Sequence, residues 1–115
     1  MINRLHRFHG HNSLSYLFRN GKSQRVEFLS LKYASSKKDD YRLAVIVSKK
    51  VSKSAVVRNR IRRRIFETVR VIKKDSSKKW PIDIALTVYD EKIAKIPQQE
   101  LVKSLETLLK KSKII

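Results

Sequence analysis

The chain has 115 residues, enough for one domain with a single buried core. Its 28 Lys and Arg residues outnumber its 10 Asp and Glu residues, which gives a formal net charge of +18 and indicates a polyanionic partner. The absence of cysteine excludes disulfides and thiolate metal sites, and no apolar run approaches the ~20 residues of a membrane span, so we expect an intracellular, cytoplasmic protein without a membrane partner.

The N-terminal third is expected to hold a short helix and an extended segment. Residues 1–11 read as a polar, basic lead-in to the domain, and residues 12–20 predict a helix that Gly21 ends. Residues 23–34 have the alternation of a strand, with a bend or bulge at residues 27–29, where the alternation slips.

The rest of the chain alternates between strands and helices. Residues 41–48 are apolar on both faces, which predicts a central strand. Ser54 is a suitable N-cap for a basic helix reaching about residue 74, a strand is expected over residues 80–89, and Pro97 suits the first turn of a final helix. The order indicates an α+β sandwich that forms one domain over residues 1–115.

The stretch from Lys49 to Lys74 carries the main functional signal. Its eleven Lys and Arg residues face one acid, Glu67, so it holds +10 of the total charge. Apolar positions recur at spacings of three and four, which predicts one buried stripe: Val57, Ile61, Ile65, Thr68 and Ile72. The opposite side carries Asn59, Arg62, Arg63, Phe66, Arg70 and Lys73. Because a merely solvated face mixes both signs of charge, this one predicts binding to a nucleic acid.

No catalytic constellation stands out in the sequence. The adjacent carboxylates Asp39-Asp40 and Asp90-Glu91 fall in predicted loops, where solvated turn residues are the favoured interpretation. The three histidines of the lead-in have no cysteine or nearby carboxylate to complete a ligand set, so no metal site is predicted. Phe66 lies among cations and could either stack on a base or be covered by a neighbouring element.

Residues 49–63 closely resemble the signature of the bacterial ribonuclease P protein family. That signature is an Arg-Asn-Arg core on a helix, after a strand that ends in Ser-Lys-Lys; residues 58–60 and 48–50 match these two parts. Phe18, shortly before Gly21, agrees with the family as well. The resemblance implies an α+β fold with the order αβββαβα, in which helices pack on a four-stranded sheet and the basic helix makes a left-handed crossover.

The resemblance also implies a function. The chain would be a subunit of the ribonuclease P holoenzyme, an endoribonuclease that removes the 5′ leader of precursor tRNA to give the mature 5′ end. Its implied partners are the catalytic RNA subunit, at one protein per RNA, and precursor tRNA. The catalytic groups and most of the Mg²⁺ ions would belong to the RNA subunit, with no cofactor intrinsic to the protein.

Carried over position by position, the resemblance gives two sets of site residues. The RNA-binding set is Lys49, Lys50, Lys53, Arg58, Asn59, Arg60, Arg62, Arg63, Phe66 and Arg70. A cleft between the first helix and the sheet would hold the leader, and its residues would be Leu14, Tyr16, Phe18, Phe28, Leu31 and Tyr33. The pattern leaves open whether Leu31 or Tyr33 fills the cleft position.

Two other functions share part of this evidence. A ribosomal or other structural RNA-binding protein would have the same charge and fold class, but not the Arg-Asn-Arg signature. A helix-turn-helix DNA-binding protein needs a second short helix beside the basic one, and the strands predicted on either side argue against it.

Overall fold

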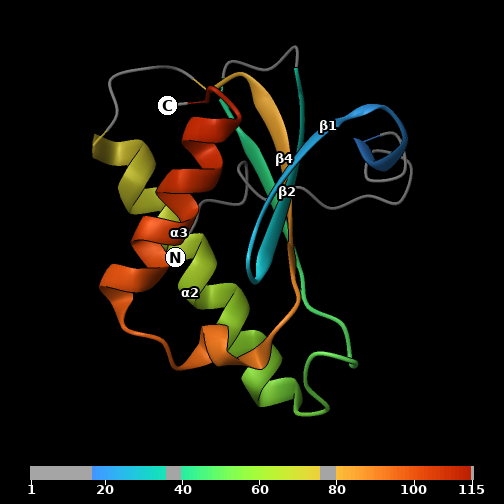
Figure 1. The fold of residues 1–115 in the computed structure, drawn as a ribbon, viewed down its shortest axis with the longest axis vertical. Helices are drawn as coiled ribbons and strands as arrows, with labels where there is room; N and C mark the ends of the chain where they lie inside the picture. The colour runs from blue at the N-terminus through green and yellow to red at the C-terminus, as the bar shows by residue number, and fades with distance from the viewer. Residues whose placement is uncertain (1–16, 36–39, 76–79, 115) are drawn as a thin grey trace.

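The computed structural model describes residues 17–35, 40–75 and 80–114, in which four strands form one sheet (Figure 1). Residues 17–20 are helical and directly precede the first strand. The following elements are β1 (Lys22–Val26), β2 (Leu29–Ser35), β3 (Arg42–Ile46), α2 (Ala55–Asp75), β4 (Ile82–Val88), the 3₁₀ turn η2 (Glu91–Ala94) and α3 (Gln98–Lys111). The α+β class and the predicted order of elements are confirmed, while the lead-in of residues 1–11 lies outside the described residues.

The strands are arranged in the order β1-β2-β4-β3. β2 is antiparallel to both β1 and β4, whereas β3 and β4 are parallel neighbours. Parallel strands cannot be joined by a tight turn, so the chain needs a crossover between them, and α2 supplies it. The crossover thus fixes the basic helix against the sheet.

Helices α2 and α3 lie together on one side of the sheet (Figure 1). The main core lies between these helices and the sheet. Leu31, Leu43 and Ile84 from the strands meet Ile65 and Leu105 from the helices there, and all five are fully buried. None of the helices in the described ranges is both long and apolar enough to span a bilayer.

Because side chains alternate along a strand, the residues between these core positions point to the other face of the sheet. We call this the open face; in the strand register it comprises Ser23, Arg25, Ser30, Lys32, Ala34, Arg42, Ala44, Ile46, Asp83, Ala85 and Thr87. The helical residues 17–20 lie on this side (Figure 1), and Leu17 packs against Ala44 and Ala85.

The bend expected near residues 27–29 is a hairpin turn. Glu27 and Phe28 connect β1 to β2, and Val26 pairs with Leu29 directly across the turn. The basic helix begins where predicted, since the Ser54 hydroxyl accepts a hydrogen bond of 3.2 Å from the Val57 amide.

Candidate nucleic-acid interface

The loop before α2 and the first half of α2 form a cluster that we call the basic surface. Its members are Lys49, Lys50, Lys53, Arg58, Asn59, Arg60, Arg62 and Arg63. The three lysines, Arg60 and Arg63 are exposed and make no hydrogen bond or ion pair within the described residues. The first turn of α2 contains no acid, so the partial positive charge of the helix N-terminus adds to these cations. The surface is therefore electrostatically suited to phosphate groups.

Three members of the basic surface make hydrogen bonds within the protein. Nη1 of Arg58 donates to the carbonyl of Ser52 at 2.9 Å, which fastens the loop to the first turn of α2. Nη1 of Arg62 donates to Oδ1 of Asn59 at 3.0 Å, one helical turn away. A guanidinium carries five N–H donors, so one such bond leaves donors free for a phosphate.

Two further arginines of α2 are engaged elsewhere in the fold. The Arg64 guanidinium donates to the carbonyls of Ile93 and Ile96, each at 2.7 Å, and so joins α2 to the segment around η2. Arg70, which we predicted to bind RNA, pairs with Glu67 at 2.9 Å. Arg64 and Arg70 are therefore less available to a nucleic acid than Arg60 and Arg63.

Phe66 does not lie where the helical pattern put it. Its side chain is partly buried and packs against the main core, whereas the pattern predicted the cationic side of α2. Of the two interpretations left open by the sequence, the structure supports coverage by neighbouring elements. The reason is that α3 and η2 widen the covered arc of α2 beyond the stripe that faces the sheet.

The open face carries two pairs of a cation and an aromatic ring. The Lys32 ammonium lies 5.4 Å from the ring centre of Phe18, which is 38% exposed, and donates to the Phe18 carbonyl. The Arg25 guanidinium lies 4.4 Å from the ring centre of Tyr89, which is 46% exposed. Exposed rings beside cations are typical of surfaces that hold unpaired nucleotides.

Three residues of the predicted leader cleft lie on the opposite face of the sheet. Leu31 is fully buried in the main core, and Phe28 and Tyr33 pack against the same core. Neither Leu31 nor Tyr33 therefore faces the N-terminal helix; Lys32, between them, does. Leu14 and Tyr16 lie outside the described residues.

The basic surface and the open face meet at one end of the sheet. β3 is parallel to β4, and β2 is antiparallel to it, so β3 and β4 end where β2 begins. The loop with Lys49 and Lys50 leaves β3 at this end, where the Tyr89 hydroxyl also contacts the Ser30 hydroxyl at 2.9 Å. A single strand of nucleic acid can thus run from the basic surface onto the open face.

Carboxylates offer little metal-binding chemistry in the described part of the chain. No three His, Cys, Asp or Glu side chains gather there as a metal site. Asp83, on the open face, accepts two hydrogen bonds of 2.7 Å from the Arg42 guanidinium. The bond to Asp83 raises the pKa of Arg42 above its ordinary value despite the opposing effect of burial, so the pair is held as an ion pair.

Comparisons with known proteins agree on one family. A sequence model of the family described as Ribonuclease P matches residues 2–113. The chain is 32% identical over 117 residues to the ribonuclease P protein component of Pseudanabaena sp. (strain PCC 6903), covering 100% of this chain and 97% of that protein. It is 33% identical over 98 residues to the component of Macrococcus caseolyticus (strain JCSC5402), covering 84% and 81%. The solved Staphylococcus aureus RNase P protein superposes with a TM-score of 0.80 at 27% identity, covering 95% of this chain and 96% of that one.

Proposed function

Since this chain belongs to the ribonuclease P protein family and is a protein subunit of ribonuclease P, a ribonucleoprotein of tRNA processing, we propose a role for each of its two surfaces. The basic surface binds the catalytic RNA of ribonuclease P, and the open face binds the single-stranded 5′ leader of precursor tRNA. The complex contains one protein per RNA and works in the cytoplasm.

The exposed, unpaired cations of the basic surface carry this proposal. Arg60 and Arg63 project from α2 without a carboxylate partner in the described part of the chain, and the loop lysines extend the same charge. Bringing phosphates to these groups releases counterions and relieves the repulsion between the cations. Such contacts position an RNA without reading its bases.

The open face supports the leader-binding half of the proposal. Phe18 with Lys32, and Tyr89 with Arg25, each combine an exposed ring for base stacking with a cation for the backbone. Stacking tolerates any base, so selection is between leader-bearing precursor and mature tRNA rather than between leader sequences.

We assign hydrolysis to the catalytic RNA and its Mg²⁺ ions. The basic surface consists of Lys, Arg and Asn, and at neutral pH none of these side chains is suited to activate a water molecule as a general base. Two observations on the described residues support this assignment: no three His, Cys, Asp or Glu side chains gather there, and Asp83 is engaged by Arg42. The protein's contribution is to position RNA and neutralise charge.

Reconstitution with the cognate catalytic RNA at low Mg²⁺ tests the first half of the proposal. We expect the protein to stimulate cleavage of precursor tRNA, and the double variant Arg60→Ala, Arg63→Ala to bind the RNA roughly tenfold more weakly or worse. The matched control is Lys103→Ala, Lys111→Ala, which removes two exposed cations from α3. No stimulation by the unaltered chain, or equal losses in both double variants, would refute the assignment.

The leader-binding half has its own readout. Phe18→Ala should weaken binding of the reconstituted holoenzyme to precursor tRNA by roughly fivefold or more, the loss expected for one stacked base. Affinity for mature tRNA, which lacks the leader, should not change. A loss of the same size for both RNAs would place the leader elsewhere.

A further inference from the structure

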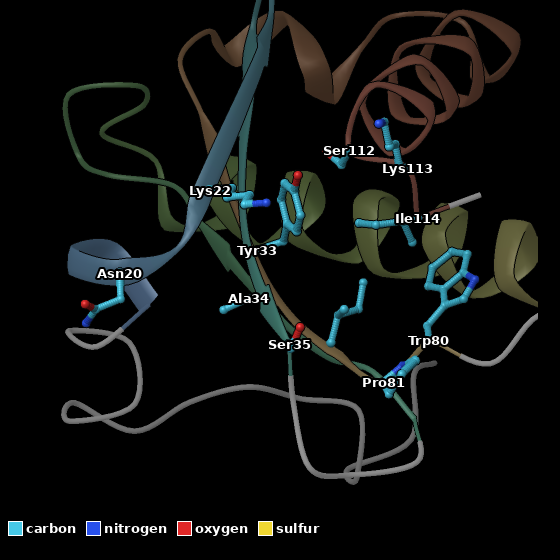
Figure 2. A pocket seen from close by; sticks show the side chains of 11 residues that line it. Asn20, Lys22, Tyr33, Ala34, Ser35, Trp80, Pro81, Ser112, Lys113 and Ile114 are labelled. Carbon is cyan, nitrogen blue, oxygen red and sulfur yellow. The ribbon is translucent and has the colours of Figure 1, made fainter.

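A cavity of about 400 Å³ lies at the end of the sheet where β1 begins and α3 ends. Figure 2 shows the side chains that line it: Tyr33 and Ile82 from the sheet, Lys113 and Ile114 after α3, Lys22 from β1 and Trp80 before β4. A volume of this size is within the range of small-ligand sites. It is separate from the basic surface, whose residues do not contribute to its lining.

The lining has the chemistry of a site for an anion that carries a planar ring. Among the described residues no Asp or Glu lines the cavity, whereas Lys22 and Lys113 reach it from two different segments. The ring of Tyr33 forms one wall, with the apolar side chain of Ile114 across the cavity (Figure 2), and Ile82 adds to the apolar lining. The Tyr33 hydroxyl has no hydrogen-bond partner within the described residues, which leaves it free to bind a ligand.

The backbone at Lys113 adds an independent observation. Lys113 has φ of 59°, in the left-handed region that favours glycine. Its amide bonds to the Lys110 carbonyl at 3.0 Å and the Ile114 amide to the Leu109 carbonyl at 2.9 Å, which is the Schellman arrangement that usually has glycine at this position. A lysine there costs stability, and such a cost is commonly retained where the side chain has a function.

We propose that this cavity binds one unpaired nucleotide of an RNA strand, with its base against Tyr33 and its phosphate between Lys22 and Lys113. Asn20 and Ala34 also line the cavity, so it adjoins the helical residues next to Phe18 at the edge of the open face. A strand that crosses the open face toward Phe18 arrives at this cavity. The source of the strand rests on the proposed function, but nucleotide binding itself does not.

The chain without catalytic RNA, titrated with uridine 5′-monophosphate, provides the test. Trp80 is the sole tryptophan of the chain and lines the cavity, so its fluorescence reports occupancy. We expect a saturable change, and amide shifts in NMR spectra that centre on Tyr33 and Ile114. Uridine and ribose 5-phosphate, which each lack one half of the ligand, should bind more weakly.

Lys113→Gly is the decisive variant because it cannot fail for lack of folding. Glycine relieves the left-handed backbone, so its melting temperature should equal or exceed that of the unaltered chain. Its affinity for uridine 5′-monophosphate and for a short oligouridylate should fall roughly fivefold or more, as for the loss of a charge-assisted hydrogen bond. Lys111→Ala, which removes a nearby exposed charge outside the lining, should bind as before.

Several outcomes would overturn the proposal. One is the absence of saturable binding of uridine 5′-monophosphate, and another is amide shifts confined to the open face around Phe18. The others are an affinity for uridine 5′-monophosphate, or for the oligouridylate, that Lys113→Gly leaves unchanged. The proposed function is tested separately: nucleotide binding with failed reconstitution rejects only the function, and reconstitution without nucleotide binding rejects only the cavity.

Discussion

Arginine side chains on α2 serve two different purposes, although they follow one another in the chain. Arg63 is exposed and has no partner among the described residues, whereas Arg64 donates to two main-chain carbonyls. The difference arises from the 100° turn between successive helical residues, which directs Arg64 toward η2 and Arg63 toward solvent. Composition alone therefore overstates the number of cations that RNA can reach.

Arg64→Ala should destabilise the fold. Its removal leaves the carbonyls of Ile93 and Ile96 without the charged donor that now satisfies them, at a cost of about 1–3 kcal/mol. Thermal unfolding should show a melting temperature lower by several degrees. Arg64→Lys should recover little of the loss, since one ammonium cannot reproduce the planar fork that reaches both carbonyls.

Arg63→Ala is the control for that measurement. An exposed residue without partners in the described part of the chain should change stability by no more than about 0.5 kcal/mol. If both variants melted at the same temperature, the contacts of Arg64 would contribute nothing to the fold.

Residues of the candidate nucleic-acid interface could be predicted from the sequence only where they belong to a recognisable motif. Asn59 and Arg63 are exposed on α2, as the helical spacing indicated, whereas Arg58, Arg60 and the loop lysines were added by the resemblance to the family motif. Arg25, Lys32 and Tyr89 were missed because each looks like an ordinary surface residue in the sequence. Only the fold sets Arg25 beside the ring of Tyr89 and Lys32 beside the ring of Phe18. The signal was present in the alternation: with Leu31 in the core, Lys32 had to face the other way.

At the scale of elements, the helices and β4 followed from periodicity, but the β1–β2 hairpin did not. The turn at Glu27 and Phe28 contains no glycine, proline, asparagine or aspartate, so it lacks the residues that usually mark a hairpin. Phe28, Leu31 and Tyr33, which we predicted to line the leader cleft, belong to this same segment and face the main core instead. Which face of a strand is covered depends on where α2 and α3 pack. That is set by tertiary contacts, which the local sequence pattern does not show.

The junction between the N-terminal helix and β1 depends on one glycine. A Cβ at Gly21 would lie 2.6 Å from the Leu17 carbonyl oxygen and 3.0 Å from the Tyr33 carbonyl oxygen. Both contacts are with main-chain atoms, which cannot rotate away as a side chain does. The Gly21 amide also donates to the Leu17 carbonyl at 2.8 Å, so the close approach is part of how the helix ends.

Gly21→Ala should therefore displace residues 17–20 from the open face. We expect a loss of about 1–3 kcal/mol of folding free energy, as for other overpacked sites, and weaker binding of precursor tRNA through the displaced Phe18. Denaturant unfolding and the precursor-to-mature affinity ratio measure the two effects. Ser23→Ala, an exposed position in β1, should leave stability unchanged, and a Gly21→Ala protein of unaltered stability would contradict the steric argument.

At the scale of the whole molecule, the fold separates charge from packing. α2 buries Ile61, Ile65 and Ile72 against the sheet and directs the basic surface away from it, so folding gathers cations that an extended chain would keep apart. Within the described residues, none of the cations of this surface pairs with a carboxylate. The free energy of that repulsion is recovered when phosphates bind, which links the fold to association with the RNA.

This link predicts a steep salt dependence. If five to eight phosphates of the RNA are engaged, the logarithm of the association constant should fall with the logarithm of salt concentration with a slope of roughly −4 to −7. Arg60→Ala and Arg63→Ala should each make the slope shallower by about 1, because each removes one phosphate contact. Lys103→Ala lowers the net charge by the same amount, but Lys103 lies on α3. The salt dependence of RNA binding by this variant should therefore have the same slope as that of the unaltered chain. If all three variants had the same slope, the slope would follow net charge alone. The RNA would then respond to the overall electrostatic field of the molecule, and α2 would contribute charge without being a specific binding surface.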